Sequence, residues 1–230
     1  GNAGHDTIDF SVSGAIVLTG VLPSIDDDLT IAGPGAAQLA VSGDNRCRVF
    51  SITNGVAVTI TGLTVRDGSA SNGGGIWTAG NLYLEGVTVV GNKATGSHPN
   101  GKGGGGYVRY GSATLSGTQV GGNLADYGGG VYVSQGSATL SGTQVVSNWA
   151  DYGGGVWILY GSATLSEAQV VSNSANFAGG GVYVRHHSAT LDVNGGEVVS
   201  NSADVGGGVY VSQGSATLNR TQVVSNSAIH

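Results

Sequence analysis

The segment GGGVYVSQGSATLSGTQVVSN at residues 128–148 returns at residues 206–226 with two substitutions, and this repetition constrains the fold more than any other feature. Looser copies lie between the two. The glycine triplets begin near Gly128, Gly153, Gly179 and Gly206, at spacings of 25, 26 and 27 residues. A period of this size indicates a solenoid, in which each repeat buries its apolar face only against neighbouring repeats.

The repetition extends over most of the chain. Further copies begin near Gly73 and Gly104, and we interpret the segment between them, at 93–104, as an inserted loop. Upstream, VAVTITGLTVRDG and LTIAGPGAAQLAVSG keep the rhythm of strands with less regular turns. We therefore predict one domain over residues 1–230 with eight to nine turns. The turns are less regular over residues 1–72, and regular glycine-rich repeats occupy residues 73–230.

Apolar and polar residues alternate within each repeat, as in Val131 and Val133 or Ala138 and Leu140. A period of two indicates strands, and no repeat contains a segment with the period of a helix. The 44 glycines, combined with 40% hydrophobic residues, fit short strands joined by tight turns better than a disordered linker. The sequence therefore predicts an all-β fold, a right-handed parallel β-helix (solenoid) with three short strands and about 25 residues per turn.

A pair of motifs in the repeat resembles a known class of protein. Gly129, Gly130 and Val131 form a glycine-glycine-aliphatic motif, and VVSN follows at 145–148. The chain in this respect resembles secreted bacterial right-handed parallel β-helix repeat proteins. It is also similar to the repeats of the chlamydial polymorphic outer membrane proteins, which pair GGA plus an aliphatic residue with FxxN; this sequence has Val in place of that Phe. The resemblance implies a β-helix that is extracellular or at the cell surface, and implies no particular activity.

Charge and hydropathy exclude two classes of function. The chain has 8 Lys and Arg, which are not clustered, and a formal net charge of −6. Phosphate binding requires a basic stripe, so we expect no nucleic-acid partner. No apolar run is long enough to cross a membrane as a helix, so we expect no transmembrane segment.

One corner of the repeat carries asparagine. Asparagine tolerates the left-handed backbone conformation of a tight corner, and stacked amides can hydrogen-bond along a column. We therefore predict a structural ladder formed by Asn92, Asn123, Asn148, Asn173, Asn201 and Asn226.

An aromatic residue lies between the two inward-facing valines of the first strand, so the alternation predicts that it points outward. The resulting ladder is Trp77, Tyr107, Tyr132, Trp157, Tyr183 and Tyr210. If exposed, such a strip could bind glycan rings or a neighbouring chain, or its rings could simply stabilise the sheet by packing on one another. A second outward column, at the turn before each glycine triplet, consists of Tyr127, Tyr152, Phe177 and Val205.

Two other columns suggest alternative functions. Thr114, Thr139, Thr164, Thr190 and Thr217 form a threonine ladder, which is how several ice-binding β-helices order water. Asp126, Asp151 and Asp204 form an acidic column, which a calcium ion could stabilise and which a polysaccharide lyase or hydrolase would need. We interpret these carboxylates as turn-stabilising groups and expect neither a metal site nor another cofactor.

The leading hypothesis is a non-enzymatic, extracellular structural or adhesive solenoid. Near-identical repetition without a unique polar cluster favours a protein whose role is to be long and stiff. Unpaired strand edges at the ends of a solenoid favour self-association into an end-to-end fibre. The alternatives are a carbohydrate-binding adhesin with a glycan or cell-surface ligand on its aromatic ladder, a polysaccharide lyase or hydrolase, and an ice-binding protein.

Overall fold

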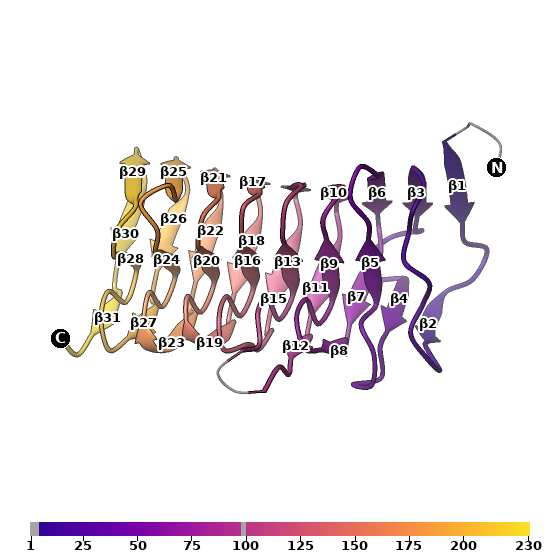
Figure 1. Cartoon of the computed structure of the whole chain (residues 1–230), viewed down its shortest axis with the longest axis horizontal. Helices are drawn as coiled ribbons and strands as arrows, with labels where there is room; N and C mark the ends of the chain where they lie inside the picture. The colour runs from indigo at the N-terminus through magenta and orange to yellow at the C-terminus, as the bar shows by residue number, and fades with distance from the viewer. Residues whose placement is uncertain (1–4, 98–99) are drawn as a thin grey trace.

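The computed structural model describes residues 5–97 and 100–230, so the first four residues and part of the insertion predicted at 93–104 lie outside it. Over the described residues the protein is all-β, without a helix, and forms a parallel solenoid of about nine turns (Figure 1). Successive regular turns are 25 residues apart, as Ser112 and Ser137 show. The predicted all-β parallel solenoid is confirmed. No helix in the described part of the chain could cross a membrane.

Three long parallel sheets run along the solenoid. Sheet A contains β1 (Asp6–Asp9), β3 (Leu29–Ala32), β6 (Ala57–Thr61), β10 (Asn81–Glu85), β14 (Ser112–Ser116), β17 (Ser137–Ser141), β21 (Ser162–Ser166), β25 (Thr190–Asn194) and β29 (Ser215–Asn219). Sheet B contains β2 (Gly14–Val17), β4 (Leu39–Ser42), β7 (Thr64–Arg66), β11 (Thr88–Val90), β15 (Gln119–Gly121), β18 (Gln144–Val146), β22 (Gln169–Val171), β26 (Glu197–Val199) and β30 (Gln222–Val224). Sheet C contains β5 (Phe50–Ile52), β9 (Ile76–Thr78), β13 (Gly106–Val108), β16 (Val131–Val133), β20 (Val156–Ile158), β24 (Val182–Val184) and β28 (Val209–Val211).

The later turns contain a fourth short strand that the sequence did not predict. Sheet D contains β19 (Trp149–Tyr152), β23 (Ser174–Ala178), β27 (Ser202–Ala203) and β31 (Ser227–Ala228). Earlier in the chain, β8 (Ser69–Ala70) and β12 (Lys93–Ala94) pair at the corresponding corner. These strands lie between sheet B and the glycine triplets, and they direct the chain towards sheet C.

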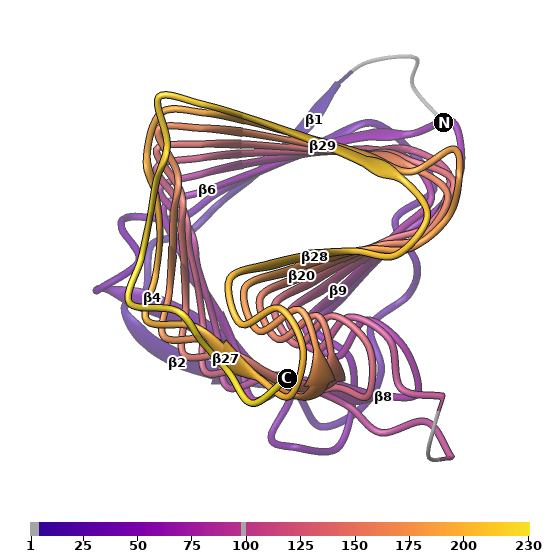
Figure 2. The same ribbon diagram turned by 90° about the vertical axis from the view of Figure 1, so that its left-hand side faces the viewer.

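The view along the solenoid shows that sheet C is an internal wall (Figure 2). Sheets A, B and C enclose a large interior, and the segment between sheets D and C curls back over the other face of sheet C. The large interior is the main core. It is filled by aliphatic columns in register, in which Leu140, Val145 and Val156 are fully buried. No single turn could bury these residues, so stacking of the turns creates the core.

The glycine triplet is required where the chain enters sheet C. Gly128 has a φ of 64°, in the left-handed region that favours glycine. A Cβ on Gly130 would lie 2.6 Å from the carbonyl oxygen of Gly155 in the next turn. The close approach of the two backbones therefore excludes any larger residue at Gly130.

The asparagine ladder runs through the corner between sheet B and sheet D, and its amide hydrogen bonds confirm the prediction. The Oδ1 atom of Asn148 accepts hydrogen bonds from the backbone N–H and the Nδ2 of Asn123, both at 3.0 Å. Its Nδ2 donates to the Oδ1 of Asn173 and to the carbonyl of Val120, both at 2.9 Å. Each buried amide is thus bonded to the turns on both sides.

Of the two reasons given for asparagine at this corner, the left-handed backbone conformation was wrong. The left-handed conformation belongs to the preceding residue, as at Ser147, Ser172 and Ser200, whose φ angles are 55°, 55° and 56°. The serine adopts the turn conformation, which places the following asparagine side chain inside the solenoid. There its amide forms the hydrogen bonds that buried backbone groups would otherwise need from water. Asparagine is selected for its hydrogen bonds rather than for its backbone freedom.

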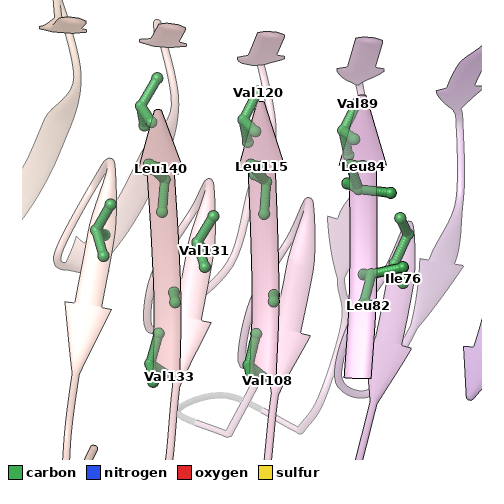
Figure 3. Close-up of a cluster of buried hydrophobic side chains, with 14 of the residues drawn as sticks. Ile76, Leu82, Leu84, Val89, Val108, Leu115, Val120, Val131, Val133 and Leu140 are labelled. Carbon is green, nitrogen blue, oxygen red and sulfur yellow. The ribbon is translucent and has the colours of Figure 1, made fainter. Parts of the chain in front are cut away.

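One turn has a gap in the main core. Gly106 in β13 occupies the column that holds Ile76 in the turn before and Val131 in the turn after. An apolar cavity of about 30 Å³ lies there, lined by these two residues and by Val108, all drawn in Figure 3. A Cβ on Gly106 would meet no atom within 4 Å.

Gly106→Ala is expected to stabilise the protein by about 1 kcal/mol, because it fills part of an apolar cavity and restricts the unfolded chain. The measurement is the free energy of unfolding in urea. The matched control is Gly105→Ala, whose new Cβ would lie 2.7 Å from the carbonyl oxygen of Gly130 and should destabilise the fold. A loss of stability in the Gly106 variant would contradict the assigned cavity.

Asn148→Ala is expected to cost about 3 kcal/mol, because it leaves buried donors and acceptors in both neighbouring turns without partners. Asn219→Ala is the control, since Asn219 is exposed and makes a single side-chain bond, to Asn194 at 3.3 Å. Its loss should change the free energy of unfolding by less than about 0.5 kcal/mol. Equal effects of the two variants would show that the buried asparagine ladder contributes no more to stability than an exposed amide hydrogen bond.

Candidate functional site

The aromatic ladder predicted from the sequence forms in register along sheet C. Its members pair one to one from β9 to β28: Trp77, Tyr107, Tyr132, Trp157, Tyr183 and Tyr210. From Tyr107 to Tyr210, each ring contacts the next. The ring centroids of Tyr132 and Trp157 are 6.2 Å apart in nearly parallel planes, and those of Trp157 and Tyr183 are 4.3 Å apart with an edge contact.

The prediction that this ladder is exposed was wrong. Tyr132, Trp157 and Tyr183 are only 2%, 1% and 6% exposed, and the other three members are partly buried. The residues point away from the main core, as predicted, but they point into a second core. The segment between sheets D and C covers them, so the ladder does not offer a flat aromatic surface to a glycan.

This second core, the aromatic lobe, is closed by residues of the covering segment. It consists of Tyr107, Tyr127, Tyr132, Tyr152, Trp157, Leu159, Ala178, Tyr183, Val205 and Tyr210. The rings of Tyr127 and Tyr152 lie 5.0 Å and 5.7 Å from that of Trp157, both in edge contacts. Edge-to-face packing of this kind adds to the stability gained from burial alone.

The second predicted column is only partly correct. Tyr127 pairs with Tyr152, but Tyr152 pairs with Ala178 rather than with Phe177, because the register shifts between sheet D strands β19 and β23. Phe177 is therefore 48% exposed, although its ring still contacts that of Tyr152 at 5.0 Å. An extra residue in this repeat turns the phenylalanine outward and places a small alanine in the lobe.

Burial governs the ionisation of the lobe. Burial raises the pKa of Tyr132, and nearby tyrosine hydroxyls add to the shift while Arg185 opposes it. Burial likewise raises the pKa of Tyr107, Tyr127 and Tyr183. These phenols therefore remain neutral at pH values where an exposed tyrosine ionises.

Cations lie at the edges of the lobe. Arg48 is partly buried near Trp77, with its Cζ atom 6.0 Å from the ring centre, and burial lowers its pKa. It donates to the carbonyls of Asn72 and Gly73 at 2.7 and 3.0 Å. The Cζ of Arg185 lies 5.8 Å from the ring of Trp157. One guanidinium, that of Arg185, thus lies over Trp157 of the lobe, and the other lies near Trp77, a ladder residue outside the lobe.

The threonine ladder on sheet A is shorter than predicted. Thr114, Thr139 and Thr164 pair in three successive turns, but Thr164 pairs with Asp192. Thr190 was assigned to this column wrongly; it pairs with Ser162. Towards the N-terminus, Tyr83 separates this run of threonines from Thr59 in the same column. Towards the C-terminus, Asp192 separates it from Thr217. A continuous threonine surface therefore spans only three turns.

The acidic column is engaged with nearby backbone and amide groups. Asp126 accepts a hydrogen bond from the backbone N–H of Gly101 at 2.7 Å, and Asp151 accepts one from the Nδ2 of Asn176 at 2.7 Å. Asp204 lies at the same corner near the last described turn, where its carbonyl accepts from Ile229 and His230. Among the residues that the structure describes, no three His, Cys, Asp or Glu side chains converge as a metal site would require.

One exposed column was missed by the sequence analysis. On sheet B, Gln119, Gln144, Gln169, Glu197 and Gln222 occupy equivalent positions. The amide of Gln144 donates to that of Gln169 at 3.1 Å. The sequence signal was a glutamine or glutamate followed by valine, which recurs at the start of each of these sheet B strands.

Comparisons with protein-family models, with curated proteins and with solved structures found no match to this chain.

The buried tyrosines predict alkaline destabilisation. Above pH 10, the ordinary tyrosine pKa, the unfolded chain loses phenolic protons that Tyr132 and Tyr183 retain when folded. The folded state then binds more protons than the unfolded state, so the free energy of unfolding falls as pH rises. This contribution is complete below pH 10 and is lost progressively above it. Unfolding in urea across the alkaline range measures it.

Tyr132→Phe should reduce the slope of stability against pH above the ordinary tyrosine pKa, because it removes one protected phenol. Tyr83→Phe is the control, since Tyr83 is 47% exposed. Phenolate absorbance gives an independent reading. Titration of all nine tyrosines together, with the fold intact, would contradict the burial of the lobe.

Proposed function

We propose that this protein is a non-enzymatic structural rod, extracellular or at the cell surface, whose copies stack end to end. The observation that carries the proposal is the continuity of its columns. Asn92 to Asn226 form an unbroken amide ladder, each member bonded to the next at 2.9–3.1 Å. Such hydrogen bonding couples the turns that carry these asparagines to one another and resists bending.

The last described turn supports the stacking part of the proposal. Leu218 and Val223 occupy the inward columns that hold Val193 and Val198 one turn earlier. Val193 and Val198 are at most 1% exposed, whereas Leu218 and Val223 are 39% and 47% exposed. Another turn in the same register would cover them. In the proposed assembly, a second copy supplies that turn.

The first described turn has matching chemistry. Ile8 in β1 begins the column that ends with Leu218, and Ile16 in β2 begins the column that ends with Val223. If β29 and β30 of one copy pair with β1 and β2 of the next, Ile8 covers Leu218 and Ile16 covers Val223. Two of the three long sheets and two aliphatic columns then continue across the junction.

We expect filaments with a subunit repeat of roughly 40 Å, nine strand spacings, in electron micrographs of the purified protein. Val223→Arg should abolish them, because it places a charge in the apolar junction. Val224→Arg is the matched control: Val224 is equally exposed at 47% but points outward from sheet B. Single particles at every concentration, or filaments that survive Val223→Arg, would overturn end-to-end stacking.

A further inference from the structure

A cleft opens at the mouth of the aromatic lobe. It lies between the covering segment, which contributes Lys102 and Tyr127, and the outer edge of sheet C, which contributes Trp157, Leu159 and Arg185. Its volume is about 240 Å³, comparable to a single sugar ring, and polar and apolar groups both line it. Tyr132 and Asn100 complete the lining. Unlike the columns of the solenoid, this set of side chains occurs in one place only.

Two of the chain's eight lysine and arginine residues line this cleft, although the protein is acidic overall. Within the described part of the chain, neither Lys102 nor Arg185 forms an ion pair with a carboxylate. The guanidinium of Arg185 lies over the ring of Trp157, which leaves its N–H groups available to an acceptor. Two carboxylates, those of Asp126 and Asp151, interact electrostatically with Tyr127, but neither lines the cleft.

Trp157 supplies an independent indication. Its side chain is 1% exposed, and its indole Nε1 is buried without a hydrogen-bond partner among the described residues. A buried donor in this state is costly, and native structures rarely leave one unsatisfied without a functional reason. Because the same indole lines the cleft, an acceptor oxygen bound there is the natural partner for its N–H.

We propose that this cleft binds an acidic saccharide through one sugar ring and its anionic group. Arg185 and Lys102 donate charge-assisted hydrogen bonds to the carboxylate or sulfate oxygens, which a planar guanidinium can contact at two atoms. The Trp157 N–H and the Asn100 amide donate to further oxygens, and Leu159 and Tyr127 contact the apolar face of the ring. This binding role goes beyond that of the rod and does not depend on whether the copies stack.

Isothermal titration with a galacturonate trimer, a sulfated galactose, a neutral galactose trimer and inorganic sulfate tests the proposal. We expect binding of one or both acidic sugars, with the preferred one identifying the anionic group, and weaker binding of the neutral trimer. Arg185→Gln should weaken binding about tenfold to a hundredfold, the loss typical of a charge-assisted hydrogen bond. Arg109→Gln is the matched control, because Arg109 lies in the same column three turns away, with its Cζ 4.9 Å from the ring centre of Tyr110.

Trp157→Phe provides the second variant, since it keeps an aromatic ring in the lobe while removing the indole N–H together with part of the indole ring system. It should weaken binding about tenfold with an unchanged circular dichroism spectrum, and the indole N–H resonance of Trp157 should shift when the acidic sugar is added to the wild type. If Trp157→Phe does not fold, the proposal is still tested by Arg185→Gln, whose substitution is at an exposed residue, and by the shift of the Trp157 indole N–H resonance in the wild-type protein. Failure of both acidic sugars to bind, equal binding of inorganic sulfate, or full binding by Arg185→Gln would overturn the proposal.

Discussion

Parallel, in-register pairing of each turn with the next is the constraint on which the rest of this structure depends. It places equivalent residues about 4.8 Å apart, so every position of the repeat becomes a column of neighbours. A column is stable only if its residue is compatible with copies of itself. Aliphatic side chains such as Val145 pack on one another, and amides such as Asn148 both donate and accept. Like charges would repel at this spacing, which explains why only 10% of the residues are charged.

The same constraint explains how much of the fold could be predicted from the sequence. Alternation with a period of two assigned Val131 and Val133 to one face of a strand and Tyr132 to the other, and both assignments are correct. Alternation cannot show what lies beyond the outer face. Tyr132 is buried because the preceding corner folds back over it, and that path depends on Gly128 and on contacts between Tyr127 and Trp157. These are long-range packing effects that no local pattern contains.

The assignment of Thr190 to the wrong column shows that two segments with the same sequence motif need not pair in the register that aligns the motif. The letters SAT recur at 162–164 and 188–190, which suggested that the two threonines stack. In the structure the later strand is shifted by two residues, so that Leu191 and Val193 lie above Ala163 and Leu165. A shift of two residues keeps every side chain on its original face. Alternation therefore fits both registers, and the shared motif pointed to the one that the structure does not adopt.

Sheet C differs from sheets A and B because both of its faces are buried, and this has a consequence for recognition. Perfectly periodic columns offer the same chemistry at every turn, so they can build a rod but cannot mark one position along it. The column that follows the strands of sheet C breaks this periodicity, with Arg109, Ser134, Leu159, Arg185 and Ser212 in successive turns. It lies at the edge of the aromatic lobe, where a change of side chain does not disturb either core. A repetitive protein can acquire a specific site at a position that tolerates substitution and lies beside rigidly packed aromatic rings. Arg185, beside Trp157, occupies such a position.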